Sequence, residues 1–433
     1  MPVGRLLPSN PVPDRSARNR PRSIGTRTPG PGDARRVRRI YEQRPYPAAD
    51  ETALTDRSWR LAPMEWIDAL WKPGRSVAAP GRILVAGCGS GREAFQLSRR
   101  FPQARIVAVD FSPRSIAIAR KLRRSAPEMR NIRFAVADLA GRGFTAVAAG
   151  AFDFISCHGV LSYVPEPARV LVNLRRCLAP GGALHLGVNG AEHQSVGARR
   201  FLPAFGFDPA ELQDTPRLRK LLQFCDAILG NRGSTRLAKR AAVHLAGDLF
   251  GPFIHDLPLS EWIRMAAKAK LHFHGSYAAH HALSRASEDD LLALLMPKSR
   301  PELSELVETL TPAGFHRLVF TRRPVDEPPW ENQQALLAWQ PVRTRLYGSR
   351  LPRRSDSWQA LRNVVFSSPA TNTRVDYRMP EWELEILRRS NGQRSLAEIL
   401  KTIPVTVPTD VLRQQLFVLS QLLVIQVLPN RVT

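Results

Sequence analysis

The sequence predicts a doubly wound α/β fold, and two observations support this prediction. From Arg82 onward, short apolar runs alternate with helical stretches, which is the pattern of a parallel sheet covered by helices. The chain has 433 residues, of which 43% are hydrophobic and 23% charged, so it is long and apolar enough for two or three folded domains. Together these features exclude a small disulfide-stapled module and a wholly disordered chain.

Seven strands are expected. Five read as apolar runs in the first half of the α/β region, and two more follow a long insertion; they comprise residues 83–88, 105–110, 132–138, 152–159, 183–189, 271–277 and 316–323. The helix after the second strand is expected to begin with Ser112 as its N-cap and Pro113 in its first turn.

Composition divides the chain into five segments. Residues 1–38 are rich in Pro, Gly, Ser and Arg and lack apolar periodicity, so we expect a disordered basic arm. The C-terminal segment shows three short helical patterns and a final strand, and it resembles a small winged-helix module. The other expected segments are an N-terminal helical cap, residues 39–80; the sheet domain, residues 81–325, with substrate-lid insertions at about 190–260 and 280–315; a connector, residues 326–360; and the C-terminal module itself, residues 361–433.

The chain is strongly basic, with 63 Lys and Arg against 38 Asp and Glu and a net charge of +25. Such an excess raises nucleic acid or an acidic surface as a partner. However, 55 of the basic residues are Arg, and no basic stripe alternates with aromatic residues as in a nucleic-acid groove. A diffuse Arg-rich surface is therefore the favoured interpretation.

Cysteine spacing and hydropathy limit the remaining classes. The four cysteines are far apart with no C-x-x-C pair, which indicates reduced thiols and no metal site of the zinc-finger type. No apolar run is long enough for a membrane span, and the N-terminus lacks the apolar segment of a secretory signal. We therefore expect a cytoplasmic protein with no membrane partner.

The strongest functional signal is the loop Gly87-Cys88-Gly89-Ser90-Gly91, which directly follows the first expected strand. Glycines allow a ligand close to the backbone, and the N-terminus of the next helix attracts negative groups. A dinucleotide fingerprint would require a further glycine at the position of Arg92, so a pyrophosphate ligand is not favoured.

Two carboxylates follow the next strands. Asp110 ends the second strand, 19 residues after Gly91, where it could accept hydrogen bonds from ribose hydroxyls, and Asp138 ends the third strand, near the place for an adenine amino group. The loop and these two side chains fit an adenosine that carries no pyrophosphate.

These motifs, ILVAGCGSG, VAVDFSP, FAVADL, FDFISCHGVLSYV and LAPGGALHLGV, resemble in sequence and order those of the class I S-adenosylmethionine-dependent methyltransferases of the bacterial type. The likeness covers residues 81–190 and, more loosely, residues 260–323. It implies a Rossmann-like seven-stranded methyltransferase sheet with S-adenosylmethionine as cofactor. The residues that it implies are Gly87, Gly89 and Gly91 at the methionyl portion, Asp110 at the ribose, Phe111 on the adenine face, and Asp138 with Leu139 at the adenine edge.

The chain departs from the family at two points. Ala86 stands where an acidic residue often precedes the first glycine, and Ser162-Tyr163 stand where the family often has paired histidines or Glu and His. Residues 38–52 resemble a Tyr-Pro segment that folds over the cofactor in some of these enzymes. A simple connector whose Tyr41 and Tyr46 pack is the alternative.

His158 closes the fourth strand, at the edge where open α/β sheets bind ligands. It could contact the cofactor, act as a catalytic base toward the acceptor, or be a histidine satisfied by backbone groups. The sequence leaves all three roles open.

The function that these features predict is a methyltransferase acting on an unidentified acceptor. A small molecule is favoured because of the long lid insertions, while a protein or RNA acceptor stays open. A non-catalytic S-adenosylmethionine-binding regulator that uses the C-terminal module for partner binding is the main alternative. An oxidoreductase is disfavoured by Arg92 and by the later motifs.

Overall fold

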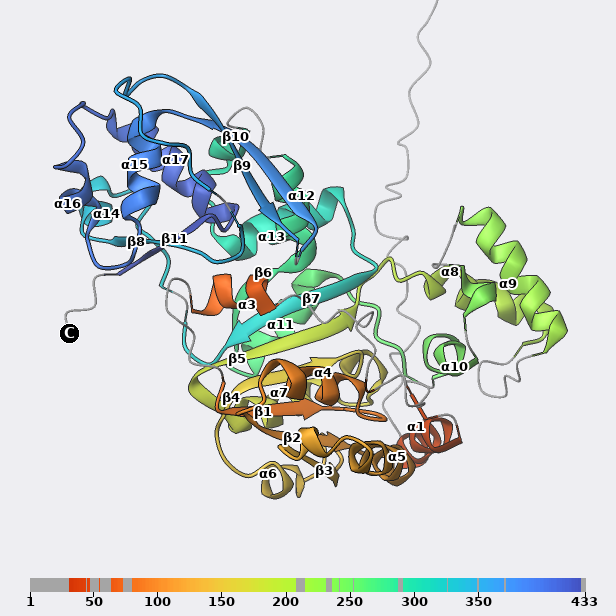
Figure 1. Ribbon diagram of the computed structural model, residues 1–433. Coiled ribbons are helices and arrows are strands. Elements are labelled where there is room, and N and C mark those ends of the chain that lie inside the picture. Colours follow the sequence, from red (N-terminus) through yellow and green to blue (C-terminus); the bar gives the residue numbers. More distant parts are fainter. Residues whose placement is uncertain are drawn as a thin grey trace, which may run out of the picture.

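The computed structural model describes residues 31–43, 45–46, 54, 64–72, 80–207, 215–230, 236–240, 242–251, 253–286, 291–324, 326–348, 350–369 and 371–429. Its centre is a seven-stranded sheet with the strand order β3-β2-β1-β4-β5-β7-β6 (Figure 1). The strands are β1 (Arg82–Ala86), β2 (Arg105–Asp110), β3 (Ile132–Val136), β4 (Phe152–His158), β5 (Leu178–Asn189), β6 (His272–Ser276) and β7 (Phe315–Thr321). The predicted seven-stranded sheet is confirmed.

Strand direction decides which residues meet at the functional edge. Strands β1 to β5 pair in parallel, whereas β7 runs antiparallel to both β5 and β6. The first residues of β7 therefore lie at the same edge as the last residues of the parallel strands. One boundary differs from expectation: β5 begins at the buried Leu178, which pairs with Phe152, and not at residue 183.

Helices cover both faces of the sheet, because each βα unit buries apolar residues on one side or the other. One face packs against α3 (Met64–Trp71), α4 (Arg92–Arg100) and α5 (Pro113–Arg124), and the other packs against α6 (Phe144–Val147), α7 (Pro167–Cys177) and α11 (Leu259–Lys268). Ser112 caps α5 as predicted and accepts a hydrogen bond from the backbone N–H of Ser115 at 3.2 Å. Short 3-10 helices lie at Pro127–Met129, Leu161–Tyr163, Leu202–Phe205, Leu237–Lys239 and Leu291–Leu295.

Helical structure begins closer to the N-terminus than predicted. Helix α1 (Pro31–Gln43) begins inside the range assigned to a disordered arm, so that prediction is wrong for residues 31–38. The physical reason is an apolar side chain among the arginines, since Val37 is buried with only 7% of its surface exposed. Arg38 and Glu42, one turn apart, add an ion pair at 2.9 Å. The prediction for residues 1–30 lies outside the described residues.

The C-terminal part begins before residue 361. It comprises α14 (Gln333–Leu337), β8 (Gln340–Arg343), β9 (Arg362–Ser368), β10 (Thr373–Met379), α15 (Glu381–Arg389), α16 (Leu396–Leu400), α17 (Thr409–Gln421) and β11 (Ile425–Leu428). Strand β8 pairs with β11, and Trp330, Leu336 and Val342 are buried in the core of this part. The predicted connector 326–360 is therefore wrong, because its Trp and Leu side chains complete the C-terminal core.

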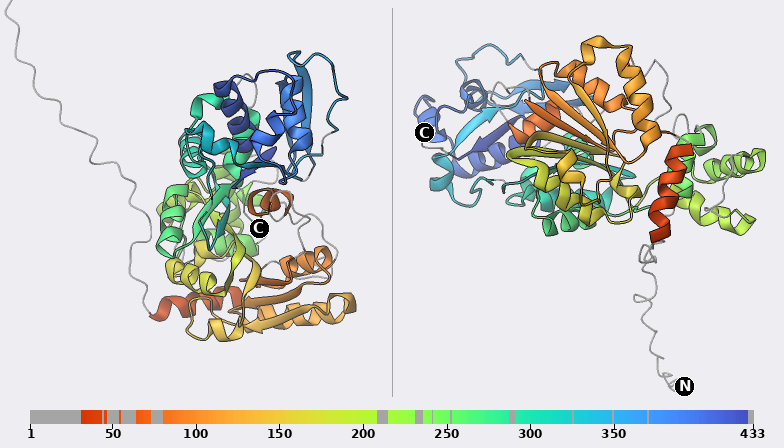
Figure 2. Two further views of the ribbon diagram at one scale, coloured as in Figure 1. Left: turned by 90° about the vertical axis from the view of Figure 1, so that its left-hand side faces the viewer. Right: turned by 90° about the horizontal axis from the view of Figure 1, so that it is seen from below.

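The two predicted lid insertions lie at different ends of the molecule. Helices α8 (Ser195–Phe201), α9 (Pro216–Ile228) and α10 (Ala242–Phe250) share a small apolar core and project beyond the carboxyl edge, on the side of α1 (Figures 1 and 2). Helices α12 (Tyr277–Arg285) and α13 (Arg300–Leu310) instead pack against the C-terminal part: the Tyr277 hydroxyl donates to the Thr371 carbonyl at 3.1 Å. The second insertion is therefore a support for the C-terminal part and not a lid, because its helices bury their apolar faces there. Among the helices that the structure describes, none is both long and apolar enough to cross a membrane.

Candidate functional site

A cavity of about 1280 Å³ opens at the carboxyl edge of the sheet, between the glycine loop, α1 and α10. Its volume exceeds the roughly 300–1,000 Å³ of an ordinary small-molecule pocket, so it has room for two ligands side by side. Eight of the predicted site residues line it: Gly87, Cys88, Gly89, Asp110, Phe111, Asp138, Leu139 and His158. Ser90 and Gly91 do not line the cavity but lead into α4 behind it.

The glycine loop takes a backbone path that other residues would resist. Gly87 has a φ of 78° and Gly91, the N-cap of α4, a φ of 95°. A Cβ atom on Gly87 would come within 2.3 Å of Val160 Cγ2. The loop therefore brings its backbone to the cavity at a place where a side chain has no room, as the sequence predicted for a ligand-binding turn.

Asp110 is held in place by the backbone on both of its carboxylate oxygens. The N–H of Gly89 donates to Oδ2 and the N–H of Ser112 to Oδ1, both at 2.9 Å. Burial raises the pKa of Asp110, and the backbone donors oppose that rise. A carboxylate offers about four lone-pair positions, so Asp110 can still accept a hydrogen bond from a ribose hydroxyl.

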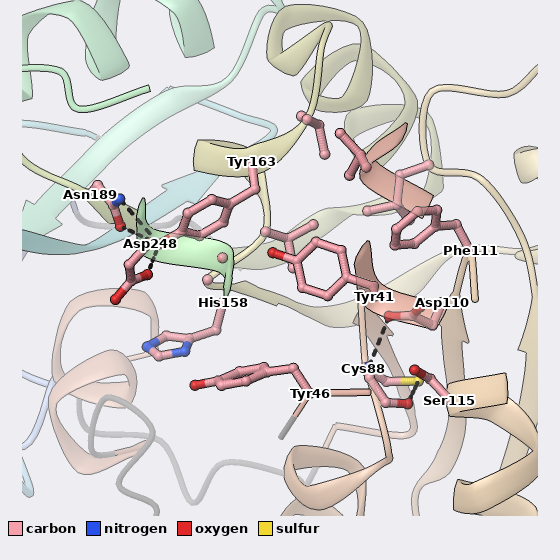
Figure 3. A pocket seen from close by; sticks show the side chains of 18 of the residues that line it. Tyr41, Tyr46, Cys88, Asp110, Phe111, Ser115, His158, Tyr163, Asn189 and Asp248 are labelled. Atoms are coloured by element: carbon pink, nitrogen blue, oxygen red, sulfur yellow. Dashed lines mark hydrogen bonds between the residues drawn. The ribbon is translucent and has the colours of Figure 1, made fainter. Parts of the chain in front are cut away.

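The residues predicted for the adenine lie beside Asp110. Phe111 contacts the ring of Tyr41 edge-on, with centroids 5.8 Å apart. Leu139 is buried, while Asp138 is exposed and its Oδ1 accepts a hydrogen bond from the N–H of Ala140 at 2.9 Å. All of these residues line the cavity, and Figure 3 shows Phe111 and Asp110 on its right-hand side.

His158 lies toward the other end, where Figure 3 shows it below Tyr163 and Asp248. Its ring stacks on that of His185 with centroids 5.8 Å apart and is 5.1 Å from the ring of Phe315. Burial and the nearby Arg317 lower the pKa of His158 to about 3. A histidine with so little affinity for a proton is a poor general base at neutral pH. Its place in the cavity wall allows contact with a ligand, and both predicted roles stay predictions.

A polar cluster that the sequence did not predict surrounds the same end. The Tyr163 hydroxyl donates to Asp248 Oδ1 at 2.6 Å and accepts from Asn189 Nδ2 at 3.2 Å. The other oxygen of Asp248 pairs with Arg240 at 2.6 Å, and Asn189 also donates to Asp256 at 3.0 Å. Tyr163 follows the end of β4 and Asn189 is the last residue of β5, so both could have been found from their positions, whereas nothing local in the sequence marks Asp248 on α10.

Two further tyrosines cover the cavity. Tyr41 of α1 and Tyr46 line it, and the Tyr46 carbonyl accepts a hydrogen bond from the N–H of Ser90 at 3.2 Å. Burial, with a contribution from Asp248, raises the pKa of Tyr46 to about 12 and that of Tyr41 further, so both phenols stay protonated. This part of the Tyr-Pro segment lies over the cavity, which supports the covering role, while residues 47–53 lie outside the described range. Among the described residues, no group of three His, Cys, Asp or Glu is arranged to hold a metal ion.

The comparisons with known proteins agree with this geometry. Residues 84–184 match the family model described as a methyltransferase domain. Together with the strand order, this match confirms the predicted class I S-adenosylmethionine-dependent methyltransferase domain, with S-adenosylmethionine as its cofactor.

Several individual relatives are similar to this chain. It is 33% identical over 129 residues to a trans-aconitate 2-methyltransferase of Deinococcus radiodurans, covering 30% of this chain and 44% of the relative. A protein of Synechococcus sp., described as uncharacterized, is 29% identical over 282 residues, covering 62% of this chain and 66% of the relative. The chain thus spans about two thirds or less of the length of these relatives. The solved structure of PKMT2 from Rickettsia typhi has a TM-score of 0.50 at 15% identity and covers 87% of this chain and 76% of that chain, which shows a shared fold.

Proposed function

We propose that this chain transfers a methyl group from S-adenosylmethionine to a small-molecule acceptor. The observation that carries the proposal is one continuous cavity with two chemically different ends. Asp110 and the glycine loop form one end, and Tyr163, Asn189 and Asp248 form the other. The similarity to the Deinococcus trans-aconitate 2-methyltransferase supports a small acceptor.

The bound cofactor would supply an activated methyl group on a sulfonium. The residues of this chain would bind and orient the two molecules: Asp110 accepts from the ribose, and the glycine loop leaves space for the methionyl portion. Tyr163 and Asn189 would position the acceptor with hydrogen bonds, and α1 and α10 would limit the access of water. Holding the acceptor in line with the methyl group is then the main catalytic contribution, and no residue needs to act as an obligatory base.

The C-terminal part is proposed to be a winged-helix-like module with an intramolecular role. Its helices α15 to α17 are followed by β11, which pairs with β8, and Val342 of β8 also bridges Asn391, so a small sheet accompanies the three helices. The basic residue of α17, Arg413, is already engaged, since it donates to the Trp330 carbonyl at 3.2 Å and pairs with Asp410 at 2.6 Å. Contacts within the chain therefore fit this module better than phosphate contacts with nucleic acid.

Calorimetric titration with S-adenosylhomocysteine tests the cofactor site. Charge-assisted hydrogen bonds contribute about 1.5–3 kcal/mol, so Asp110→Ala should weaken binding at least tenfold. The control is Glu128→Ala, which removes an exposed carboxylate outside the cavity and should leave the affinity unchanged. Failure of the wild-type protein to bind, or tighter binding of NAD, would contradict the proposed function. Formation of S-adenosylhomocysteine from S-adenosylmethionine with a panel of acceptors then separates an enzyme from a non-catalytic regulator.

A further inference from the structure

Arg317 is a cavity residue that neither the predicted cofactor site nor the polar cluster uses. It lies near the start of β7, opposite Gly187 of β5, and its side chain lines the cavity. Because β7 is antiparallel, this position reaches the carboxyl edge of the sheet. Arg317 is close enough to His158 and His185 for its charge to lower the pKa of both histidines.

The guanidinium of Arg317 has no acidic partner within the part of the chain that the structure describes. No ion pair or hydrogen bond involves its side chain there, and its Nε is buried without a hydrogen-bond partner. Burial lowers the pKa of Arg317, and no carboxylate opposes this effect. Two other arginines of the cavity differ, since Arg240 is paired with Asp248 and Arg38 with Glu42.

Aromatic rings hold Arg317 in position. The guanidinium carbon lies 5.6 Å from the ring centroid of Tyr277 and 5.8 Å from that of Phe315. Such contacts are favourable for a cation, but they do not satisfy its N–H donors. A partly buried guanidinium with free donors facing a cavity is arranged to receive an anionic group of a ligand.

We propose that Arg317 binds a carboxylate of the methyl acceptor, an inference that rests on the proposed methyltransferase function. The planar fork of Arg matches the two oxygens of a carboxylate, so one contact would both neutralise the charge and orient the acceptor. The acceptor is then a small carboxylic acid, and Arg317 is the residue that selects it.

The place of Arg317 in the sheet assigns it to the acceptor and not to the cofactor. The predicted cofactor residues follow β1, β2 and β3, while β4 and β5 separate that half of the sheet from β7. The Tyr163, Asn189 and Asp248 cluster lies on the β5 side, as does His158 at the end of β4. An anion bound at Arg317 would therefore lie beside the hydrogen-bonding groups proposed to hold the acceptor.

To test this, the protein is first saturated with S-adenosylhomocysteine. Trans-aconitate, succinate and benzoate are then titrated into it, and each is compared with its uncharged methyl ester. Wild-type protein should bind at least one carboxylate more tightly than its ester. Arg317→Gln should weaken that binding at least tenfold, and Arg317→Lys should weaken it less, because the charge remains and the planar fork is lost. The control Arg323→Gln removes an exposed arginine just beyond β7 and should change nothing.

A second readout follows the titration of His158 by NMR. A carboxylate that neutralises Arg317 should raise the pKa of His158 in the wild-type protein, and Arg317→Gln should raise it without any ligand. The proposal is wrong if no carboxylate distinguishes wild type from Arg317→Gln, or if inorganic phosphate binds there more tightly than every carboxylate.

Measurements with S-adenosylhomocysteine alone separate this inference from the proposed function. Arg317→Gln should keep the wild-type affinity for S-adenosylhomocysteine. A loss of that affinity in a folded variant would place Arg317 at the methionyl carboxylate of the cofactor and overturn the acceptor assignment, while the methyltransferase function would stand. Absence of binding by the wild-type protein would instead remove the proposed function itself.

Discussion

Replacement of the buried Glu93 should change how the stability of the protein depends on pH. Glu93 lies in the first turn of α4, lines the cavity and is only 7% exposed. Burial raises its pKa from 4.5 to about 7, although a hydrogen bond from the Ser156 hydroxyl opposes this rise. At 1.36 kcal/mol per pH unit, the difference corresponds to about 3 kcal/mol.

The sign follows from which state holds the proton. Below pH 4.5 the carboxyl is protonated in both the folded and the unfolded chain, so it adds no penalty. Between pH 4.5 and about 7 the unfolded chain releases the proton while the folded chain keeps it, and folding stability falls as the pH rises. Above pH 7 the penalty is constant. The glutamine of Glu93→Gln does not titrate. The stability of this variant relative to the wild type should therefore increase by about 3 kcal/mol when the pH is raised from 4 to 8.

Urea denaturation at a series of pH values measures this difference. Buried histidines such as His158 and His193, with pKa values lowered to about 3 and about 4, give the opposite slope at acid pH. They are present in both proteins, so they cancel when wild type and variant are compared. Ser156→Ala should raise the pKa of Glu93 in the folded protein further, because it removes the hydrogen bond that favours the ionised carboxylate. The fall in stability should then extend to higher pH. If the difference in free energy of unfolding between wild type and Glu93→Gln stays constant with pH, the reasoning is refuted.

Two other predictions concern the walls of the cavity. Gly87→Ala should lower the free energy of unfolding by about 2–4 kcal/mol, through its positive φ and its clash with Val160. Adding Val160→Ala should recover the part due to the clash, and strictly additive losses in urea denaturation would contradict this. Deletion of residues 1–43 should weaken S-adenosylhomocysteine binding in calorimetry, because α1 lines the cavity and its Tyr41 contacts Phe111, whereas deletion of residues 1–30 should not. Equal affinities of the two truncated proteins would show that α1 does not contribute to the cofactor site.

The cofactor half of the site could be predicted because its signals are local. Gly87, Asp110 and Asp138 each stand within two residues of the end of a strand, and the apolar runs identify those strands. Parallel strands end at the same edge, so residues far apart in the sequence could be placed together without knowing any loop.

The predictions for α1 and for residues 326–360 were wrong for one common reason. In α1, arginines surround the few apolar positions, so composition concealed the buried Val37. Residues 326–360 are rich in proline and arginine, yet Trp330 and Leu336 are buried by partners at the other end of the chain, among them Phe417 of α17. Periodicity over a short window does not show which distant surface an isolated apolar residue will find.

The sequence by itself determined the sheet, the glycine turn and the carboxylates at the edge of the sheet. The reason is that each strand and its end depend on residues that are close together in the sequence. Only the tertiary structure decided that Asp248 of a distant insertion would meet Tyr163, and that Arg317 would line the cavity without a carboxylate beside it. The first depends on the path of a long insertion across the edge of the sheet, and the second on the reversed direction of β7. Neither is set by local propensity, since both follow from how elements far apart in the chain pack together.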